Sequence, residues 1–161
     1  MRRRCFGLLL VASSLLLTSC GFHLRGTAGI AERYQPLVVA RVVADGGQEQ
    51  MIRRALERAG ALPGDMQTGA NRLNLVLSRK LDTFLNSRRN NDLLLVELRA
   101  SLSYSLVDAD GASILTESII TSSQTVELDS DNVLSHNEVL NEARDDQDSA
   151  LLRSLIGRLR N

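Results

Sequence analysis

Aromatic residues are scarce in this sequence, which has no tryptophan, two tyrosines and three phenylalanines among its 161 residues. Proteins that bind single-stranded nucleic acids stack the bases on aromatic rings, so this composition argues against that class of ligand. Cysteine is also rare. The two cysteines, Cys5 and Cys20, both lie in the first 20 residues, so the remainder of the chain has no pair that could form a disulfide. No apolar run of about 20 residues, the length that spans a bilayer as a helix, follows Cys20.

The first 20 residues have the pattern of a bacterial export signal. Three arginines at positions 2–4 precede an apolar run from Phe6 to Leu17, which is too short to remain as a membrane helix. The following residues, Thr18-Ser19-Cys20, complete a stretch that resembles a lipobox, in which the cysteine thiol takes a diacylglycerol before the chain is cut. We expect residues 1–19 to be removed and Cys20 to be the lipid attachment site. An ordinary secretory signal with a stray cysteine is the alternative.

The lipid on Cys20 predicts where the protein resides. A diacylglyceryl group together with an N-acyl chain holds a protein stably on a membrane, whereas one chain does not. Gly21, rather than an aspartate, follows the cysteine, which resembles the address of lipoproteins sorted to the outer membrane. Removal of the signal leaves 16 of the 19 cations against 19 acids, so the mature chain is mildly acidic and we expect no nucleic-acid partner.

Hydrophobic periodicity predicts a β-α-β-β-β-α order of elements. Apolar and polar residues alternate with a period of two in the strands, and apolar residues recur at helical spacing in the helices. The predicted elements are a strand at 37–43, a helix at 48–59, strands at 71–81, 94–106 and 112–126, and a helix that starts at 129–132 or at 135 and ends near 159. A polar loop is expected at 86–92. The order predicts an α+β fold, a two-layer sandwich with two helices on a four-stranded, mostly antiparallel sheet.

The length after the signal suits one domain. We expect residues 20–35, rich in small residues at 26–31, to be a lipidated tether and residues 36–161 to be a single domain. No G-x-S-x-G or phosphate-loop pattern occurs, and we expect no enzyme and no metal or other cofactor besides the acyl chains. Asp108, Asp110 and Gly111 could be forced onto part of a calcium loop, but strands flank them, so a hairpin turn is expected.

The stretch Cys20-Gly21-Phe22-His23-Leu24-Arg25-Gly26 resembles the start of the mature LPS-assembly lipoprotein LptE family. The resemblance continues more weakly in the element order, a Phe-x-Asn sequence at Phe84 and Asn86, and a last helix that ends Leu155-Ile156-Gly157. It implies two helices on a four-stranded sheet. It also implies an LptD-like outer-membrane β-barrel as partner, which the lipoprotein plugs and helps to assemble, and binding of lipopolysaccharide on its way to the outer leaflet.

Family members bind lipopolysaccharide through a basic residue directly after the loop phenylalanine and another near the start of the last helix. Here Leu85 follows Phe84, and the second position falls at His136. The nearest cations that could meet the phosphates are Arg88 and Arg89, with Arg79 and Lys80 earlier on the strand. The alternative for these four cations is a solvated hairpin tip.

Two functions remain open at this point. One is the lipopolysaccharide translocon subunit that the resemblance implies, on the periplasmic side of the outer membrane. The other is a lipid-anchored adaptor of another envelope assembly, for example in barrel insertion, that binds protein only. The wet face of the long strand, with Ser101, Ser103 and Ser105, is either a solvated sheet face or a surface that contacts the polar inner wall of a barrel.

Overall fold

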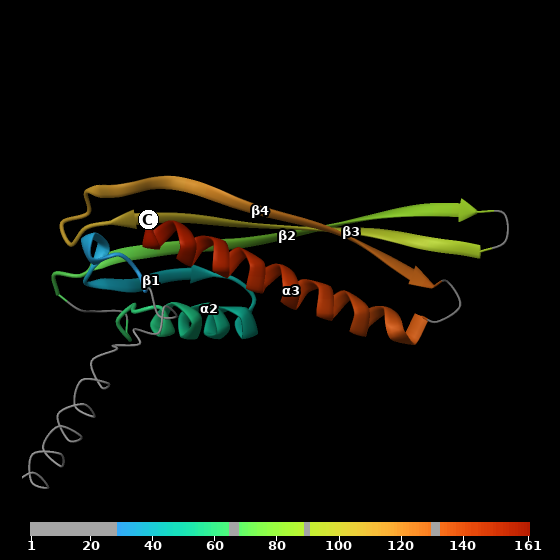
Figure 1. The fold of residues 1–161 in the computed structure, drawn as a ribbon, viewed down its shortest axis with the longest axis horizontal. Coiled ribbons are helices and arrows are strands. Elements are labelled where there is room, and N and C mark those ends of the chain that lie inside the picture. The colour runs from blue at the N-terminus through green and yellow to red at the C-terminus, as the bar shows by residue number, and fades with distance from the viewer. Residues whose placement is uncertain (1–28, 65–67, 89–90, 130–132) are drawn as a thin grey trace, which may run out of the picture.

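The computed structural model describes residues 29–64, 68–88, 91–129 and 133–161. It contains a short 3-10 helix followed by four strands and two α-helices in the order β-α-β-β-β-α (Figure 1). The elements are η2 (Glu32–Tyr34), β1 (Leu37–Val43), α2 (Gly46–Arg58), β2 (Asn71–Arg88), β3 (Asn91–Val107), β4 (Ser113–Asp129) and α3 (Val133–Arg160).

The four strands form one mixed sheet with the order β1-β2-β3-β4. β1 is parallel to β2, and α2 connects the two, as a parallel pair requires a crossover. β2, β3 and β4 form two antiparallel pairs in which the partners are consecutive in the chain. β1 is much shorter than the other three strands, so the sheet has four strands at one end and three at the other.

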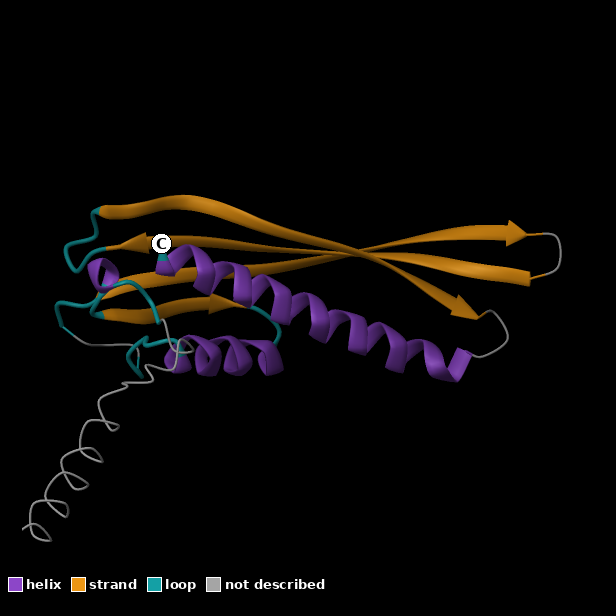
Figure 2. Ribbon diagram, in the orientation of Figure 1, coloured by secondary structure: helices purple, strands orange, loops and turns teal. Residues whose placement is uncertain are grey.

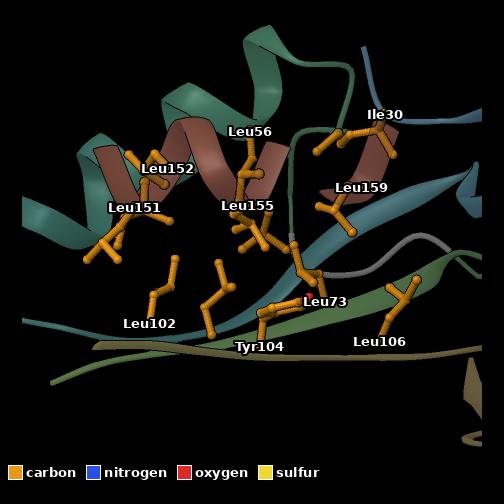
Figure 3. Close-up of a cluster of buried hydrophobic side chains, with 14 of the residues drawn as sticks. Ile30, Leu56, Leu73, Leu102, Tyr104, Leu106, Leu151, Leu152, Leu155 and Leu159 are labelled. Carbon is orange, nitrogen blue, oxygen red and sulfur yellow. The ribbon is translucent and has the colours of Figure 1, made fainter. Parts of the chain in front are cut away.

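Both helices lie on the same face of the sheet, as Figure 2 shows. α3 runs obliquely along the sheet and packs chiefly on β4 and β3, while α2 packs on β1. Most strand side chains that point toward the helices are apolar, and beside α2 and the C-terminal half of α3 they form one cluster with the apolar stripes of both helices (Figure 3). The predicted two-layer α+β fold is confirmed, including its mostly antiparallel sheet.

α2 ends at Arg58, one residue before the predicted end, and a glycine follows its C-cap. Gly60 has φ +107°, a conformation that only glycine adopts without strain. Its N–H donates to the carbonyl of Glu57 at 3.0 Å, and the N–H of Ala61 donates to that of Leu56 at 2.9 Å. These two bonds form the Schellman motif that satisfies the last carbonyls of a helix. The chain then leaves α2 in a fixed direction, toward the bridge between Leu62 and Val38.

α3 begins at Val133, which agrees with the earlier of its two predicted starts, so Ser135 lies in its first turn and does not cap it. The boundaries of β2 and β3 at their shared hairpin differ from the predicted ones. β2 continues to Arg88 and β3 begins at Asn91, so the polar loop predicted at 86–92 is wrong for most of its length. The reason is that pairing within a hairpin uses backbone groups, which polar residues supply as well as apolar ones.

Residues 29–35, which the sequence placed in the tether, pack on the domain. The N–H of Ile30 donates to the carbonyl of Ala59, and the N–H of Ala31 donates to that of Leu159, both at 2.9 Å. The side chains of Ile30 and Tyr34 are buried in the core. The folded part of the chain therefore includes this segment, which closes the end of the core where α2 and α3 terminate.

Candidate functional site

The cation Arg79 lies on the helix-facing side of β2, in the seam between the sheet and α3. Its guanidinium donates to the carboxylate of Asp148 on α3, and the exposed fractions of the two side chains are 22% and 2%. The side-chain amide of Gln48 on α2, with its oxygen turned toward β2, accepts from the same guanidinium. Arg79 thus joins one strand and both helices through charged and polar contacts.

This pair belongs to a polar layer that divides the core. Gln147 and Asp148 are the buried polar side chains of the described residues, and Nε2 of Gln147 donates to the carbonyl of Leu98 at 2.9 Å. One apolar cluster lies beside α2 and the C-terminal half of α3, and a second, smaller cluster lies toward the start of α3. Nε of Arg79 and Oδ1 of Asp148 are buried without a hydrogen-bond partner. The polar layer therefore leaves part of its hydrogen-bonding capacity unused.

Lys80, next in sequence, lies on the opposite face of the sheet, where Arg99 is its neighbour on β3. Arg99 donates to both carboxylate oxygens of Glu97, at 2.9 and 2.8 Å, and Oγ of Ser123 on β4 donates to one of them at 2.8 Å. These hydrogen bonds lower the pKa of Glu97 to about 2, and the bond from Arg99 has the largest effect. This face of the sheet, opposite to the helices, is called the open face below. It carries a carboxylate that stays ionised at any physiological pH.

No described helix covers this open face, which is lined by small hydroxyl side chains. A shallow groove of about 410 Å³ runs across β2, β3 and β4. Its floor and rim include Ser78, Ser101 and Thr121, with Lys80 and Arg99 at one side. The sequence predicted this polar face from the alternation along β3, and the structure shows that β2 and β4 extend it on either side.

A second, larger hollow lies at the edge of the sheet. It is a cleft of about 610 Å³ between the start of α2, the middle of β2 and the first half of α3. The residues that line it include Asp45, the N-cap of α2, Gln48 from α2, Lys80 and Leu81 from β2, and Arg144 from α3. The cleft forms where β1 ends, because β2 continues beyond it without a neighbouring strand on that side.

The predicted lipopolysaccharide residues do not form one compact cluster. Arg79 and Arg88 are nine positions apart on one strand, which corresponds to about 30 Å at ~3.4 Å per residue. Arg88 is the last residue of β2, and its side chain lies outside the described part of the chain, as does Arg89. His136 is half-buried in the first turn of α3, at the same end of the molecule as the end of β2 (Figure 1). Cys20 lies outside the described residues.

The hairpin turn predicted at Asp108 to Gly111 is confirmed, and it connects β3 with β4. Oδ1 of Asp108 accepts from the N–H groups of Asp110 and Ala112 at 2.9 and 2.8 Å, and Gly111 has φ +92°. The carboxylate of Asp108 is thus used by the backbone.

Over the described ranges, no group of three or more His, Cys, Asp or Glu side chains is placed to hold a metal ion. In the same ranges, no helix has the length and apolarity needed to cross a membrane.

Asp148 is a buried residue of the site that is not among the residues predicted from the sequence. It lies close to Asp145 and Asp146, acids that favour the first half of a helix through its dipole. The signal that identifies it is its spacing, because Asp148 precedes Leu151, Leu152 and Leu155 by three, four and seven positions. A carboxylate in the apolar stripe of a helix is buried and needs a cationic partner.

The fold is similar to those of solved bacterial lipoproteins. One is an uncharacterized lipoprotein B from Nitrosomonas europaea, with a TM-score of 0.60 and 16% identity over 87% of this chain and 88% of that one. Another is a minor lipoprotein from Acinetobacter baumannii, with a TM-score of 0.52 and 16% identity over 78% of this chain and 95% of that one. At this identity the likeness shows the fold alone. No protein-family model matches the chain, and no curated protein matches its sequence.

Proposed function

We propose that the chain is an outer-membrane lipoprotein, held by the acyl chains on Cys20, whose α+β domain faces the periplasm. The arginines, apolar run and lipobox-like residues before Gly21 support the anchor. Two solved structures with this fold come from proteins that are described as lipoproteins. The packed domain begins at residues 29–35, which leaves a short connection of residues 21–28 between the anchor and the domain.

Within that class, the chain acts as an LptE-like subunit of the lipopolysaccharide translocon. The observation that carries this proposal is the fold itself. The resemblance at Cys20 to Gly26 implied two helices on one face of a four-stranded sheet, and the chain has that fold. The N-terminal motif and the fold are separate features of the chain, and both are what this proposal requires.

The open face of the sheet is the surface proposed to contact a barrel partner. It carries the small hydroxyl residues Ser78, Ser101 and Thr121 and the paired charges of Glu97 and Arg99. A surface of this kind fits the polar lumen of a large outer-membrane barrel. A photoreactive residue in place of Ser101 should therefore crosslink to the barrel, while one in place of the exposed Arg54 on α2 should not. Equal crosslinking from both positions would contradict this orientation.

Lipopolysaccharide binding is assigned to the far end of β2, which ends at Arg88 with Arg89 next in sequence, and α3 starts near His136 at the same end of the molecule. Lys80 contributes from the open face, whereas Arg79 is held by Asp148. The Arg88→Ser/Arg89→Ser variant should bind lipopolysaccharide about tenfold more weakly, because charge-assisted contacts to phosphate are lost. An Arg54→Ser/Arg58→Ser variant on α2 is the matched control. Unchanged affinity of the first variant with an intact fold would reject this assignment.

The adaptor function has one observation in its favour. Of the cations proposed to meet lipopolysaccharide, Arg79 is occupied by a buried carboxylate of the same chain, so part of the expected basic surface is internal. An adaptor has no reason to recognise lipid A. Absence of lipopolysaccharide binding by the native chain would therefore favour the adaptor over the translocon subunit.

A further inference from the structure

The outer edge of β2 lacks a strand partner over most of its length. β1 pairs with β2 only as far as Val43 and Val76. β2 continues from Leu77 to Arg88, and on its inner edge it pairs with β3 all the way to Asn91. Among the described residues, no strand lies along its outer edge beyond Val76 (Figure 1). In an antiparallel pair, half of the N–H and C=O groups of an edge strand point away from its neighbour, so they are available for pairing.

This edge has some of the devices that protect natural edge strands and lacks others. Proline, β-bulges, charged side chains and a covering helix are the common devices. The segment 77–88 has no proline, and its register with β3 is continuous, without a shift. α3 packs chiefly on β4 and β3, and it meets β2 at Arg79 through Asp148. The protection that the segment carries is its charged side chains, Arg79, Lys80, Asp82 and Arg88.

The cleft described above lies directly beside this edge. Asp45 and Gln48, at the start of α2, form its near wall, and Arg144 lies on the α3 side. The cleft is in line with β1, because it begins where β1 ends and α2 starts. Its volume is about 610 Å³, and three consecutive residues of β2, Arg79 to Leu81, line it. A chain in extended conformation can therefore enter it and continue the sheet in the position that β1 occupies at the other end.

We propose that the edge of β2 from Leu77 onward binds an extended segment of a partner protein as an added strand. Main-chain hydrogen bonds supply the affinity in this mode, and alternate side chains supply the specificity. The side chain of Leu81 faces the helices and is 45% exposed, so the residue beside it should be apolar. Lys80 faces the open side, so the residue beside it should be acidic. The partner segment thus alternates apolar and acidic or hydroxyl residues.

The test uses the lipoprotein in mild detergent and two blocked nonapeptides as probes. One peptide has valine at even positions, glutamate at positions 3 and 7 and threonine elsewhere, and the other has lysine in place of glutamate. About half of the backbone amides between residues 77 and 88 point away from β3. At millimolar concentration the acidic peptide should slow the hydrogen exchange of these amides. The lysine peptide should bind about fivefold more weakly, since opposite charges on neighbouring strands attract and like charges repel.

Variants separate the edge from nonspecific binding. Lys80→Glu should reverse the preference between the two peptides, while Arg54→Glu on the exposed face of α2 should leave it unchanged. Exchange that is unaltered at residues 77–88 with either peptide would overturn the proposal, and so would protection that appears only along β4. Protection at residues 77–88 that does not respond to Lys80→Glu would confirm the strand addition and overturn the assigned acidic preference.

Discussion

The ion pair between Arg79 and Asp148 allows a sharp test of how the two halves of the core are joined. In the Asp148→Leu variant, the guanidinium of Arg79 loses its carboxylate while only 22% of its side chain is exposed. Removing one member of a buried pair costs about 3–5 kcal/mol. Because Arg79 retains some contact with water, we expect a cost somewhat below this range, about 2–3 kcal/mol. Arg79→Met leaves Asp148 almost fully buried without a cation, so about 3–5 kcal/mol is expected.

The double variant Arg79→Met/Asp148→Leu should behave quite differently from either single one. Two apolar side chains would join the clusters that the polar layer now separates, and replacing a buried ion pair in this way is often neutral or stabilising. We expect a free energy of unfolding within about 1 kcal/mol of the native chain, and hence a coupling energy of at least ~3 kcal/mol. Both polar atoms that now lack a partner, Nε of Arg79 and Oδ1 of Asp148, are removed together.

Urea unfolding followed by circular dichroism measures these differences. Glu49→Ala is the control, because Glu49 forms an exposed ion pair with Arg53 at 3.0 Å, and its loss should cost less than about 1 kcal/mol. If the double variant loses as much stability as the two single variants together, the two residues act independently. That result would refute the explanation of the polar layer as a coupled buried pair.

Two further predictions concern the open face and the N-terminal segment. The pKa of Glu97 is depressed, to about 2 in the folded chain against 4.5 ordinarily. The contribution of this carboxylate to stability is therefore present above pH 4.5 and is lost as the pH falls toward 2. Ser123→Ala should raise the pKa of Glu97 in an NMR titration, and an unchanged value would contradict the assigned hydrogen bond. Gly29→Ala should lower the melting temperature, because a Cβ there would lie 2.5 Å from the carbonyl oxygen of Ala59, at a cost of about 1–3 kcal/mol. Gly47→Ala, in the first turn of α2 with no atom within 4 Å, should be neutral or stabilising, and equal effects of the two substitutions would contradict the docking of residues 29–35.

Much of the fold follows from hydrophobic periodicity. The alternation from Leu94 to Leu106 predicted both the long strand β3 and the face that packs on the helices, and helical spacing predicted α2 to within two residues at each end. The same period of two places Arg79 and Lys80 on opposite faces of the sheet. Closeness in sequence is therefore a poor guide to which basic residues share a face, and the alternation along the strand separates Arg79 from Lys80.

Other features depend on contacts between distant segments. Arg79 and Asp148 are 69 positions apart, and no local pattern pairs them. Ile30 lies among small residues that are typical of a linker, and it is buried only because α2 and α3 end beside it. The full length of β2 depends on its partner β3, since polar residues near Arg88 pair through the backbone. In each case the packing of other elements, rather than local propensity, determines the outcome.

The central claim, that the chain is the lipoprotein subunit of a lipopolysaccharide translocon, is tested most directly by its partner in the outer membrane. The tagged chain, extracted from membranes in mild detergent, should bring down a large outer-membrane β-barrel in about equal amount. A Cys20→Ala variant, which lacks the lipid attachment site, should be lost from the membrane fraction. Recovery of the lipidated chain from the outer membrane without any such barrel would contradict the claim.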